Sequence, residues 1–424
     1  MAASPALAPA LEARQEALHL IEAALARRGG LDEALGAPRY MALSPLDRGF
    51  ARAVVMAALR QLGPIDKILD GKLKREPPAR VRHLLRLGLA QAFWLDTPAF
   101  AAVDTTVALT PQPLRGLVNA IMRGALRDGA PAVDPRDLAP AWLMARWRSA
   151  FGEADALAVA AEIAKEPATD LTLRAAGDGE VTALLEAEAI AGGTVRLRRR
   201  GDVAQWPGYA EGRWWVQDAA AAIPARLARG LDGGRALDMC AAPGGKTLQL
   251  AAAGAKVTAL DKSAGRLRRL AAGLERTGLA AEMIAADAAT WDGGTAAFDA
   301  VLLDAPCSST GAFRRHPDVL WNARPGDLAP LSATQARLLT AAAGKVKAGG
   351  CLVYSVCSLE TEEGEAQVRR FLDLNPDFAL DPVTPGEGGS PLASLAREGW
   401  LRILPHHLAG GIDGFFIARF SRAR

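Results

Sequence analysis

Two cysteines in the last third of the chain occupy matched settings. One lies in Asp304-Ala305-Pro306-Cys307-Ser308 and the other in Tyr354-Ser355-Val356-Cys357-Ser358. A thiolate that adds to C6 of a cytosine turns the ring into an enamine and makes C5 nucleophilic, and a second thiol can assist release of the ring afterwards. Two such thiols beside a nucleotide-like cofactor are what an enzyme needs to place a methyl group on C5 of a cytosine.

The other two cysteines have a different interpretation. A lone cysteine is most often a small buried hydrophobe, and we expect this of Cys351, inside an apolar run, and of Cys240, under a loop. Cys307 and Cys357 each follow a strand-like run and enter a loop that contains Pro or Ser. Because neighbouring parallel strands end at the same edge of a sheet, we expect these two thiols to lie close together.

An acid stands three residues before Cys307. Negative charge builds on the ring when a thiolate adds to it, so N3 must receive a proton or a strong hydrogen bond. Asp304 ends the preceding strand-like run, and Pro306 stiffens the loop beside it. We therefore expect Asp304 to protonate N3. An amine methyltransferase would instead be expected to place an aromatic ring where this chain has Cys307.

The segment Asp238–Thr247 leads from a strand-like run into a helical stretch. Gly244 and Gly245 let the backbone approach a ligand closely, and the free N–H groups of the following helix suit a carboxylate. A Walker A loop needs glycine where Cys240 stands, and the G-x-G-x-x-G fingerprint is absent. These features predict a cofactor site other than a P-loop or a nicotinamide site.

Two acids follow the next two strand-like runs. In a doubly wound sheet, ligands bind at the carboxyl ends of the strands. We expect Asp261 to accept hydrogen bonds from ribose hydroxyls and Asp287 to face the adenine amino group. An acid in such a position often caps a helix instead, but the serial placement of both after strands favours a ligand.

Periodicity divides the rest of the chain. Residues 11–128 have apolar positions at helical spacing, which predicts a bundle of six or seven helices. A Pro-rich linker spans 129–140, a tryptophan-bearing helix is expected from Trp142 to about Ala164, and 167–215 contain short strand-like runs. From about residue 234, short apolar runs alternate with helical stretches, which is typical of a parallel sheet with helices on both faces.

We therefore predict an α/β protein in three parts. An all-helical domain occupies 1–130, a linker helix with a small α+β subdomain 131–215, and a Rossmann-like domain 216–424. The strand-like runs of the last part are Ala236–Met239, Lys256–Leu260, Glu282–Ala285, Asp299–Leu303, Gly350–Val356 and Gly414–Phe420. Its helical stretches are near 246–253, 263–276, 331–346 and 361–373.

Charge is uneven along the chain. The 424 residues have a net charge of +3, whereas residues 1–130 hold 17 Lys and Arg against 12 Asp and Glu. Two basic clusters stand out: Lys72, Lys74, Arg75, Arg80, Arg82 and Arg86 with Glu76 opposing them, and Arg196, Arg198, Arg199 and Arg200. Each cluster could follow a phosphate backbone or could be a solvated face of the protein.

Several classes of protein are not expected. The four cysteines form no C-x-x-C pair and the five histidines show no zinc-ligand spacing, so we expect no metal site. No apolar run reaches the roughly 18 residues of a membrane span, and the N-terminus lacks the pattern of a secretory signal. So few cysteines in so long a chain fit a reducing cytoplasm.

These motifs resemble the NOL1/NOP2/Sun family of RNA 5-methylcytosine methyltransferases, in particular its bacterial Fmu (Sun) subgroup, which acts on 16S ribosomal RNA. Asp238–Thr247 is similar to the cofactor motif of the family. Asp304–Ser308 followed by Thr310–Asp318 is similar to its motif IV, and Tyr354–Leu359 with Glu362 and Glu363 to its motif VI. Val216–Asp218 and Asp413–Phe416 resemble its flanking motifs. Residues 11–128 resemble the NusB-like RNA-binding domain that precedes the catalytic domain in this subgroup.

The resemblance implies a division of labour. Cys357 is implied to be the nucleophile, Cys307 the residue that assists release, and Asp304 the acid at N3. The residues implied to line S-adenosylmethionine are Cys240, Ala241, Ala242, Pro243, Gly244, Gly245, Lys246, Asp261, Asp287 and Asp304. The segment after Cys357 departs from the common Pro-Glu-Glu-Asn pattern, because it contains Thr361-Glu362-Glu363-Gly364.

The implied partner is RNA, namely 16S ribosomal RNA that is naked or in an assembly intermediate, and we expect a cytoplasmic monomer. The target base must leave its stack to reach the thiols, which costs less in single-stranded RNA. Two alternatives remain: the same chemistry on transfer RNA, and an RNA-binding assembly or antitermination factor with a vestigial methyltransferase domain. The intact set of Asp304, Cys307 and Cys357 argues against a vestige.

Overall fold

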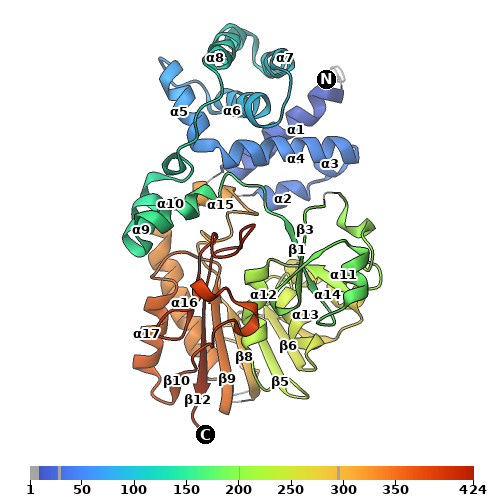
Figure 1. Cartoon of the computed structure of the whole chain (residues 1–424), viewed down its shortest axis with the longest axis vertical. Coiled ribbons are helices and arrows are strands. Elements are labelled where there is room, and N and C mark those ends of the chain that lie inside the picture. Colours follow the sequence, from blue (N-terminus) through green and yellow to red (C-terminus); the bar gives the residue numbers. More distant parts are fainter. Residues whose placement is uncertain (1–8, 27–29, 200, 294–296) are drawn as a thin grey trace. The chain divides into compact units, whose positions relative to one another are not determined.

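The computed structural model describes residues 9–26, 30–199, 201–293 and 297–424 (Figure 1). The chain forms two compact units. The first comprises Met1–Lys165 and Arg315–Ala323, and the second comprises Glu166–Arg314 and Arg324–Arg424. The domain boundaries predicted after residues 130 and 215 stay a prediction.

The described part of the first unit is helical, as predicted for residues 11–128. Its α-helices are α1 (Pro9–Ala24), α2 (Leu31–Leu35), α3 (Pro38–Met41), α4 (Pro45–Arg60), α5 (Leu62–Lys72), α6 (Ala79–Trp94), α7 (Ala99–Leu109), α8 (Arg115–Asp128), α9 (Ala141–Phe151), α10 (Glu153–Ala161) and α15 (Asp318–Asn322). In α6, Val81, Leu84 and Leu85 are buried at a spacing of three and four residues, which places them on one face of the helix. Ser44 caps α4 by accepting a hydrogen bond from the Asp47 N–H at 3.1 Å.

The helix predicted from Trp142 to Ala164 is two helices. Gly152 separates α9 from α10 and has a φ of +86°. This left-handed backbone conformation is favourable for glycine and ends the first helix. The apolar periodicity continues on both sides of Gly152, so periodicity alone could not reveal the break.

A short stretch that follows the Cys307 loop in sequence belongs to the helical unit. Within it, the Trp321 Nε1–H donates to the Leu59 carbonyl at 3.2 Å. The Asn322 side-chain amide donates to the Ala24 carbonyl, at the end of α1, at 2.7 Å. These bonds satisfy backbone acceptors at helix termini and explain why Arg315–Ala323 groups with the helices.

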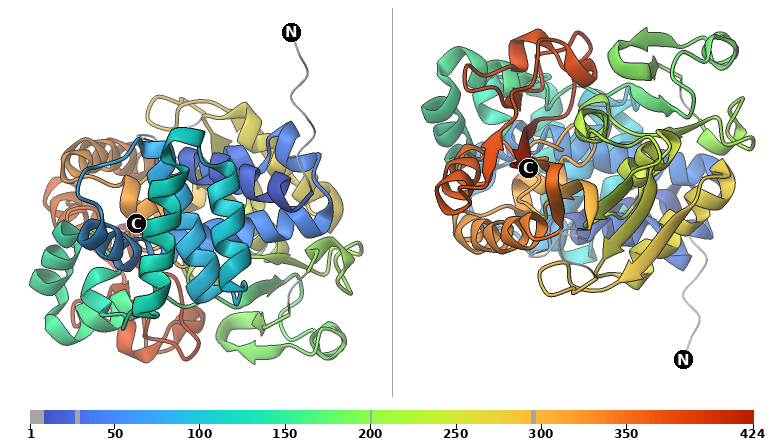
Figure 2. Two further views of the ribbon diagram at one scale, coloured as in Figure 1. Left: turned by 90° about the horizontal axis from the view of Figure 1, so that it is seen from above. Right: turned by 90° about the horizontal axis from the view of Figure 1, so that it is seen from below.

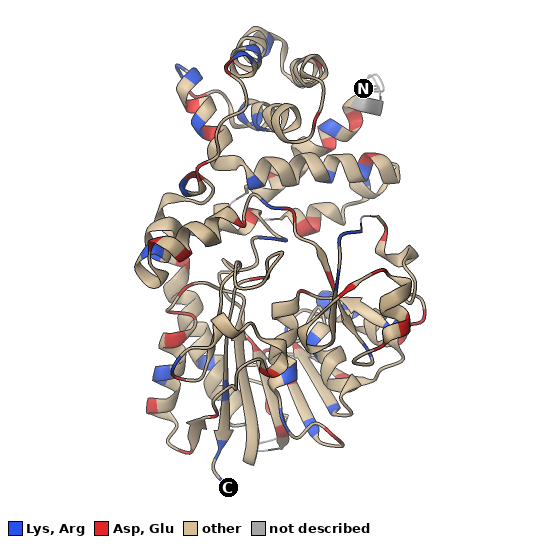
Figure 3. Ribbon diagram, viewed as in Figure 1, with Lys and Arg blue, Asp and Glu red and all other residues tan. Residues whose placement is uncertain are grey.

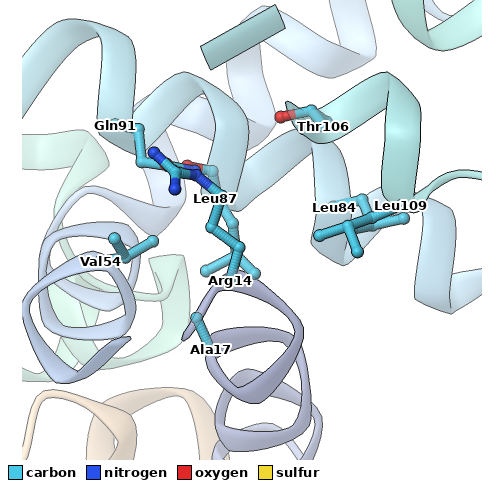
Figure 4. A pocket seen from close by; sticks show the side chains of 8 residues that line it. All are labelled: Arg14, Ala17, Val54, Leu84, Leu87, Gln91, Thr106 and Leu109. Carbon is cyan, nitrogen blue, oxygen red and sulfur yellow. The ribbon is translucent and has the colours of Figure 1, made fainter. Parts of the chain in front are cut away.

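A cavity in the helical unit is lined by Arg14 and Gln91, whose side chains point toward one another (Figure 4). The Arg14 Nε–H donates to Gln91 Oε1 at 2.7 Å. The cavity volume is about 10 Å³, which is room for about one water molecule. It is therefore a polar packing feature and too small for a ligand.

The first basic cluster is largely paired with acids. Arg82 contacts Asp66, Asp70 and Glu76 at 3.2, 2.6 and 2.6 Å. The other pairs are Arg86 with Asp66, Arg80 with Glu22, and Lys72 with Asp128. Figure 3 shows basic and acidic residues interspersed over these helices. The compensating acids come from other parts of the sequence, and phosphate binding by this cluster stays a prediction.

The second unit contains a small antiparallel sheet, as predicted for the α+β stretch. Its strands are β1 (Thr169–Leu173), β2 (Glu188–Ile190), β3 (Thr194–Leu197) and β4 (Trp214–Val216), in the order β2-β3-β1-β4. Helix α11 (Gly179–Leu184) lies between β1 and β2 in sequence. Leu171, Val195 and Trp214 belong to its buried apolar cluster.

Arg196, from the second basic cluster, is buried in this sheet rather than exposed. It pairs with Asp170 across β1 and β3, with nitrogen–oxygen distances of 2.7 and 2.8 Å. Asp170 also accepts from the Ala219 N–H at 3.2 Å. Arg198 and Arg199 are exposed, and Arg200 lies outside the described residues. A phosphate-binding role for the whole cluster was therefore wrong at Arg196.

The large sheet of the second unit is the predicted doubly wound sheet. Its strands are β5 (Arg235–Met239), β6 (Lys256–Asp261), β7 (Ala281–Ala285), β8 (Phe298–Asp304), β9 (Val346–Val356), β10 (Phe378–Leu380), β11 (Leu401–Ile403) and β12 (Phe415–Arg422). The order is β10-β12-β9-β8-β5-β6-β7, with β11 paired to β12. Strands β5 to β9 run parallel, whereas β12 is antiparallel to β9.

Helices cover both faces of this sheet. They are α12 (Ala219–Leu227), α13 (Gly245–Ala252), α14 (Ala264–Thr277), α16 (Leu328–Ala343) and α17 (Glu365–Leu374). Alternate residues of β8 separate the two layers: Val301 and Leu303 pack with α16 and α17, whereas Ala300 and Leu302 pack with α12 and α13. Figure 2 gives two further views of these layers. The predicted α/β class is confirmed.

The Asp170–Arg196 pair predicts a measurable loss of stability. Replacing Arg196 by Met leaves the Asp170 carboxylate buried without its cation, which should lower the free energy of unfolding by about 3–5 kcal/mol. Urea unfolding followed by tryptophan fluorescence measures this change. The double variant Arg196→Met with Asp170→Asn should recover part of the loss, and a single variant as stable as the parent protein would contradict the prediction.

Candidate functional site

Two parallel strands bring the predicted thiols together. Asp304, the last residue of β8, stands opposite Ser355 in β9, and Cys357 directly follows β9. The Sγ atoms of Cys307 and Cys357 lie 3.5 Å apart, within hydrogen-bonding distance of one another. Both side chains are half-buried. The structure thus places at one strand edge the two cysteines that the sequence singled out.

The two thiols have different electrostatic settings. A hydrogen bond from Cys307 lowers the pKa of Cys357, with further help from the Ser309 hydroxyl and the Lys246 ammonium, against the opposing effects of burial and of the Asp304 charge. The same hydrogen bond, with burial and the charges of Cys357 and Glu363, holds the pKa of Cys307 well above its usual value. The thiolate is therefore favoured on Cys357, with Cys307 as its hydrogen-bond donor.

An ion pair between the buried Lys246 and the half-buried Asp304 lies beside the thiols. Lys246 Nζ donates to Asp304 Oδ2 at 2.6 Å, and the Ser355 hydroxyl donates to Asp304 Oδ1 at 2.8 Å. Burial alone would lower the pKa of Lys246, but the charge and hydrogen bond of Asp304 raise it. The Lys246 ammonium group therefore donates a hydrogen bond to the Asp304 carboxylate at the end of β8.

The loop between β5 and α13 is built on Asp238. This side chain is fully buried, and its Oδ2 accepts from the Thr247 hydroxyl at 2.6 Å. Burial raises the pKa of Asp238 to about 7. Gly244 has a φ of +115° and a Cβ there would lie 2.3 Å from Leu270 Cδ1, so this position requires glycine.

The two acids assigned to the cofactor have different environments. Asp261 is buried at the end of β6, where it accepts from the Ala242 N–H at 3.2 Å and from the Ser263 N–H at 2.9 Å. Asp261 therefore fixes the backbone of the glycine-rich loop by a hydrogen bond. Asp287 is exposed beyond β7 and accepts from the Ala289 N–H at 2.9 Å. That bond is of the local capping kind, while its exposure leaves the carboxylate accessible to a ligand.

The remaining cysteines have the properties of protonated thiols. Burial raises the pKa of Cys240 to about 12 and that of Cys351 to about 11. Cys240 lies in the loop that follows β5, with a φ of +62°. Neither thiol is disposed to ionise at neutral pH.

The chemistry of this strand edge fits S-adenosylmethionine. The charges of Asp304 and Asp261 are among the causes that raise the pKa of Cys240, and negative charge at this edge suits a cationic sulfonium. Asp238 Oδ1 is buried without a hydrogen-bond partner among the described residues, as expected where a donor from a ligand or a water belongs. The loop residues 240–246 with Asp261 and Asp287 would hold the nucleoside and amino acid parts of this cofactor.

The sequence did not single out every residue of the site. Glu363 is buried and accepts from the hydroxyls of Ser308 and Ser358, both at 2.5 Å. Ser309 lies 3.6 Å from Cys357 Sγ. Glu363 belongs to the segment that resembles motif VI and Ser309 is close to Cys307 in sequence, but neither signal shows where the side chains point.

Within the described ranges, no group of three or more His, Cys, Asp and Glu side chains is arranged to hold a metal ion. In the same part of the chain, no helix has both the length and the apolar character needed to span a bilayer.

Known proteins resemble both parts of the chain. The family model described as 16S rRNA methyltransferase RsmB/F matches residues 228–421, and the NusB family model matches residues 11–127. The ribosomal RNA small subunit methyltransferase B of Xanthomonas campestris pv. campestris is 35% identical and covers 100% of both chains. Its counterpart from Vibrio cholerae is 35% identical over 90% of this chain and 91% of its own.

Solved structures show the same fold. The crystal structure of the protein PH0851 covers 99% of this chain and 100% of its own, with a TM-score of 0.77 and 24% identity. A methyltransferase homolog protein from Pyrococcus horikoshii covers 74% and 100%, with a TM-score of 0.55 and 25% identity. The chain thus belongs to the RsmB/F (Sun/Fmu) family of S-adenosylmethionine-dependent methyltransferases, with a NusB-family domain ahead of the methyltransferase domain.

Proposed function

We propose that this chain transfers the methyl group of S-adenosylmethionine to C5 of a cytosine in 16S ribosomal RNA, through a covalent bond between Cys357 and C6 of the base. The observation that carries the proposal is the thiol pair, with 3.5 Å between the sulfurs of Cys307 and Cys357 at the ends of adjacent strands. A single thiol would suffice to attack the ring. A second thiol at this distance fits the later need to release it.

The first step uses the difference in pKa between the two thiols. The Cys357 thiolate attacks C6 and forms the C–S bond, and the ring electrons displaced toward N3 require a proton there. The Lys246–Asp304 pair holds such a proton at 2.6 Å between nitrogen and oxygen. We therefore propose that Asp304 passes a proton to N3 and that Lys246 supplies this proton. This differs from the expectation that Asp304 itself is the acid.

S-adenosylmethionine, when bound, supplies the methyl group that C5 accepts. Release then requires that the C5 proton pass to solvent water; its bonding electrons re-form the C5–C6 double bond, the electrons of the C–S bond return to Cys357, and N3 gives its proton back to the Lys246–Asp304 pair. Cys307 is the group next to that sulfur. Its hydrogen bond stabilises the departing Cys357 thiolate, so it supports the last step by the same contact that favours the first.

The substrate assignment is supported by relatives of this chain. They are named as methyltransferases of small-subunit ribosomal RNA and match along nearly their whole length. A cytosine must be turned out of its stack to reach the thiols, and the NusB-family domain is the part we expect to hold the surrounding RNA. A ribosomal RNA substrate would also place the protein in the cytoplasm, and its monomeric state stays a prediction.

Substrate choice is the first test. With S-adenosylmethionine, the purified protein should methylate one cytosine of unmodified 16S rRNA, at least about tenfold faster than any transfer RNA. Bisulfite sequencing of both products after a fixed time measures the reaction and locates the base. A protein that modifies transfer RNA and leaves 16S rRNA unchanged would contradict the assignment.

The cysteine variants separate attack from release. Cys357→Ala should lower turnover by on the order of 10³-fold or more, because it removes the nucleophile. Cys307→Ala should accumulate a protein–RNA adduct that survives denaturation and migrates as a shifted band. Isothermal titration of cofactor serves as the control for folding of both variants. Normal turnover by Cys357→Ala, or normal turnover without a band for Cys307→Ala, would be inconsistent with these roles.

Thiol reactivity should follow the pKa directions. Because the pKa of Cys357 is lowered, its thiolate persists to lower pH, and its alkylation by iodoacetamide should reach half-maximal rate below the usual thiol value of about 8.5. In Cys307→Ala the lost hydrogen bond should move that midpoint upward. Mass spectrometry of peptides from the folded protein should find Cys240 and Cys351 unlabelled; faster labelling of either would refute the ordering.

A further inference from the structure

A completely buried carboxylate lies behind the two thiols. Glu363 is 0% exposed and precedes α17 in the segment that follows Cys357. Its Oε1 accepts from the Ser308 N–H at 3.0 Å and from the Gln335 amide at 2.9 Å. Its Oε2 accepts from the hydroxyls of Ser308 and Ser358, both at 2.5 Å. Four donors therefore hold this side chain in a single position.

The partners of Glu363 lie beside the cysteines in sequence. Ser308 directly follows Cys307, and Ser358 directly follows Cys357. The two serine hydroxyls also lie 3.1 Å from one another. One carboxylate thus joins the loop after β8 to the loop after β9, at the level where the sulfurs meet. A shift of Glu363 would change the separation of Cys307 and Cys357 directly.

The Glu363 carboxylate also affects the two thiols unequally. Its four donors are neutral groups, and none of them is a cation that pairs with the carboxylate. The charge of Glu363 is among the causes that raise the pKa of Cys307, whereas at Cys357 the charge of Asp304 is opposed by that of Lys246. Ionisable neighbours on the other packed elements include Tyr354, whose hydroxyl donates to the Glu363 carbonyl at 2.6 Å. Arg402 is another: it donates to the Ser358 carbonyl at 2.6 Å and pairs with Glu365 at 2.6 Å.

We propose that Glu363 is a positioning residue that sets the separation of the two thiols and, by its negative charge beside Cys307, directs the thiolate to Cys357. This inference rests on the proposed function, because it concerns which sulfur attacks the base. Glu363 itself touches neither substrate nor cofactor in this account; it acts through the two loops that it joins. A purely structural carboxylate would stabilise the loops without selecting between the thiols.

The test compares variants that separate charge from shape. Glu363→Gln keeps the size and removes the charge, whereas Glu363→Asp keeps the charge on a shorter side chain. The matched control is Glu362→Gln, which removes the same charge from the adjacent residue, whose carboxylate lies 3.4 Å from the Thr361 hydroxyl. Each full-length protein is treated with limiting iodoacetamide at pH 7, and mass spectrometry gives the ratio of label on Cys357 to label on Cys307.

The wild-type protein, Glu362→Gln and Glu363→Asp should all label mainly Cys357. Glu363→Gln should lower the Cys357:Cys307 ratio about tenfold, the effect of one pKa unit, and should reduce kcat for RNA with little change in KM. An unchanged labelling ratio in Glu363→Gln would overturn the inference. So would an equal fall in the ratio for Glu362→Gln, since that would show a general effect of charge.

Two further arms keep the test decisive. If Glu363→Gln does not fold, Ser358→Ala removes one hydrogen bond to the same carboxylate and should lower kcat without altering the labelling ratio; an unchanged kcat would overturn the positioning role. Because labelling is measured without RNA, a wild-type protein that fails to methylate RNA would refute the proposed function alone. Failure of the labelling shift would refute this inference alone.

Discussion

The site depends on one contact, the hydrogen bond between two chemically identical thiols whose sulfurs are 3.5 Å apart. Such a contact is useful only when one thiol is ionised and the other is protonated, since two thiolates at this distance would repel one another. The surroundings supply the asymmetry. The hydrogen bond of Ser309 and the charge of Lys246 lower the pKa of Cys357 against the charge of Asp304, whereas the charge of Glu363 raises the pKa of Cys307. Two residues of the same type thus have different roles because their surroundings differ.

The fold makes this arrangement possible because parallel strands end together. Strand β8 ends at Asp304 and β9 stands beside it with Ser355 opposite, so the acid and both thiols share one edge of the sheet. The neighbouring strand β5 ends at the same edge, and the glycine-rich loop and the start of α13, which contains Lys246, follow it. Buried apolar layers on both faces fix the strand positions, and a rigid sheet is better suited than a loop to hold sulfurs at a defined distance.

Much of this could be predicted from the sequence because it rests on local patterns. Alternation of apolar runs and helical stretches located the strands, and the position of each cysteine after a strand indicated that they would meet. Long-range pairing could not be predicted. The acids that neutralise Arg82 come from several segments, Arg196 faces the interior because of β-sheet register, and Glu363 has no local pattern that reveals its four donors. Each depends on which distant residues the fold brings together.

The central claim is that the sulfur of Cys357 becomes bonded to C6 of the base while Cys307 stays free. RNA that contains 5-fluorocytosine at the target position tests it most directly, because fluorine in place of the C5 proton prevents release and preserves the adduct. Tandem mass spectrometry of the digested adduct identifies the cysteine attached to the nucleotide. The account predicts attachment to Cys357 in the wild-type protein. Attachment to Cys307, or a methylated product with no trapped adduct, would contradict it.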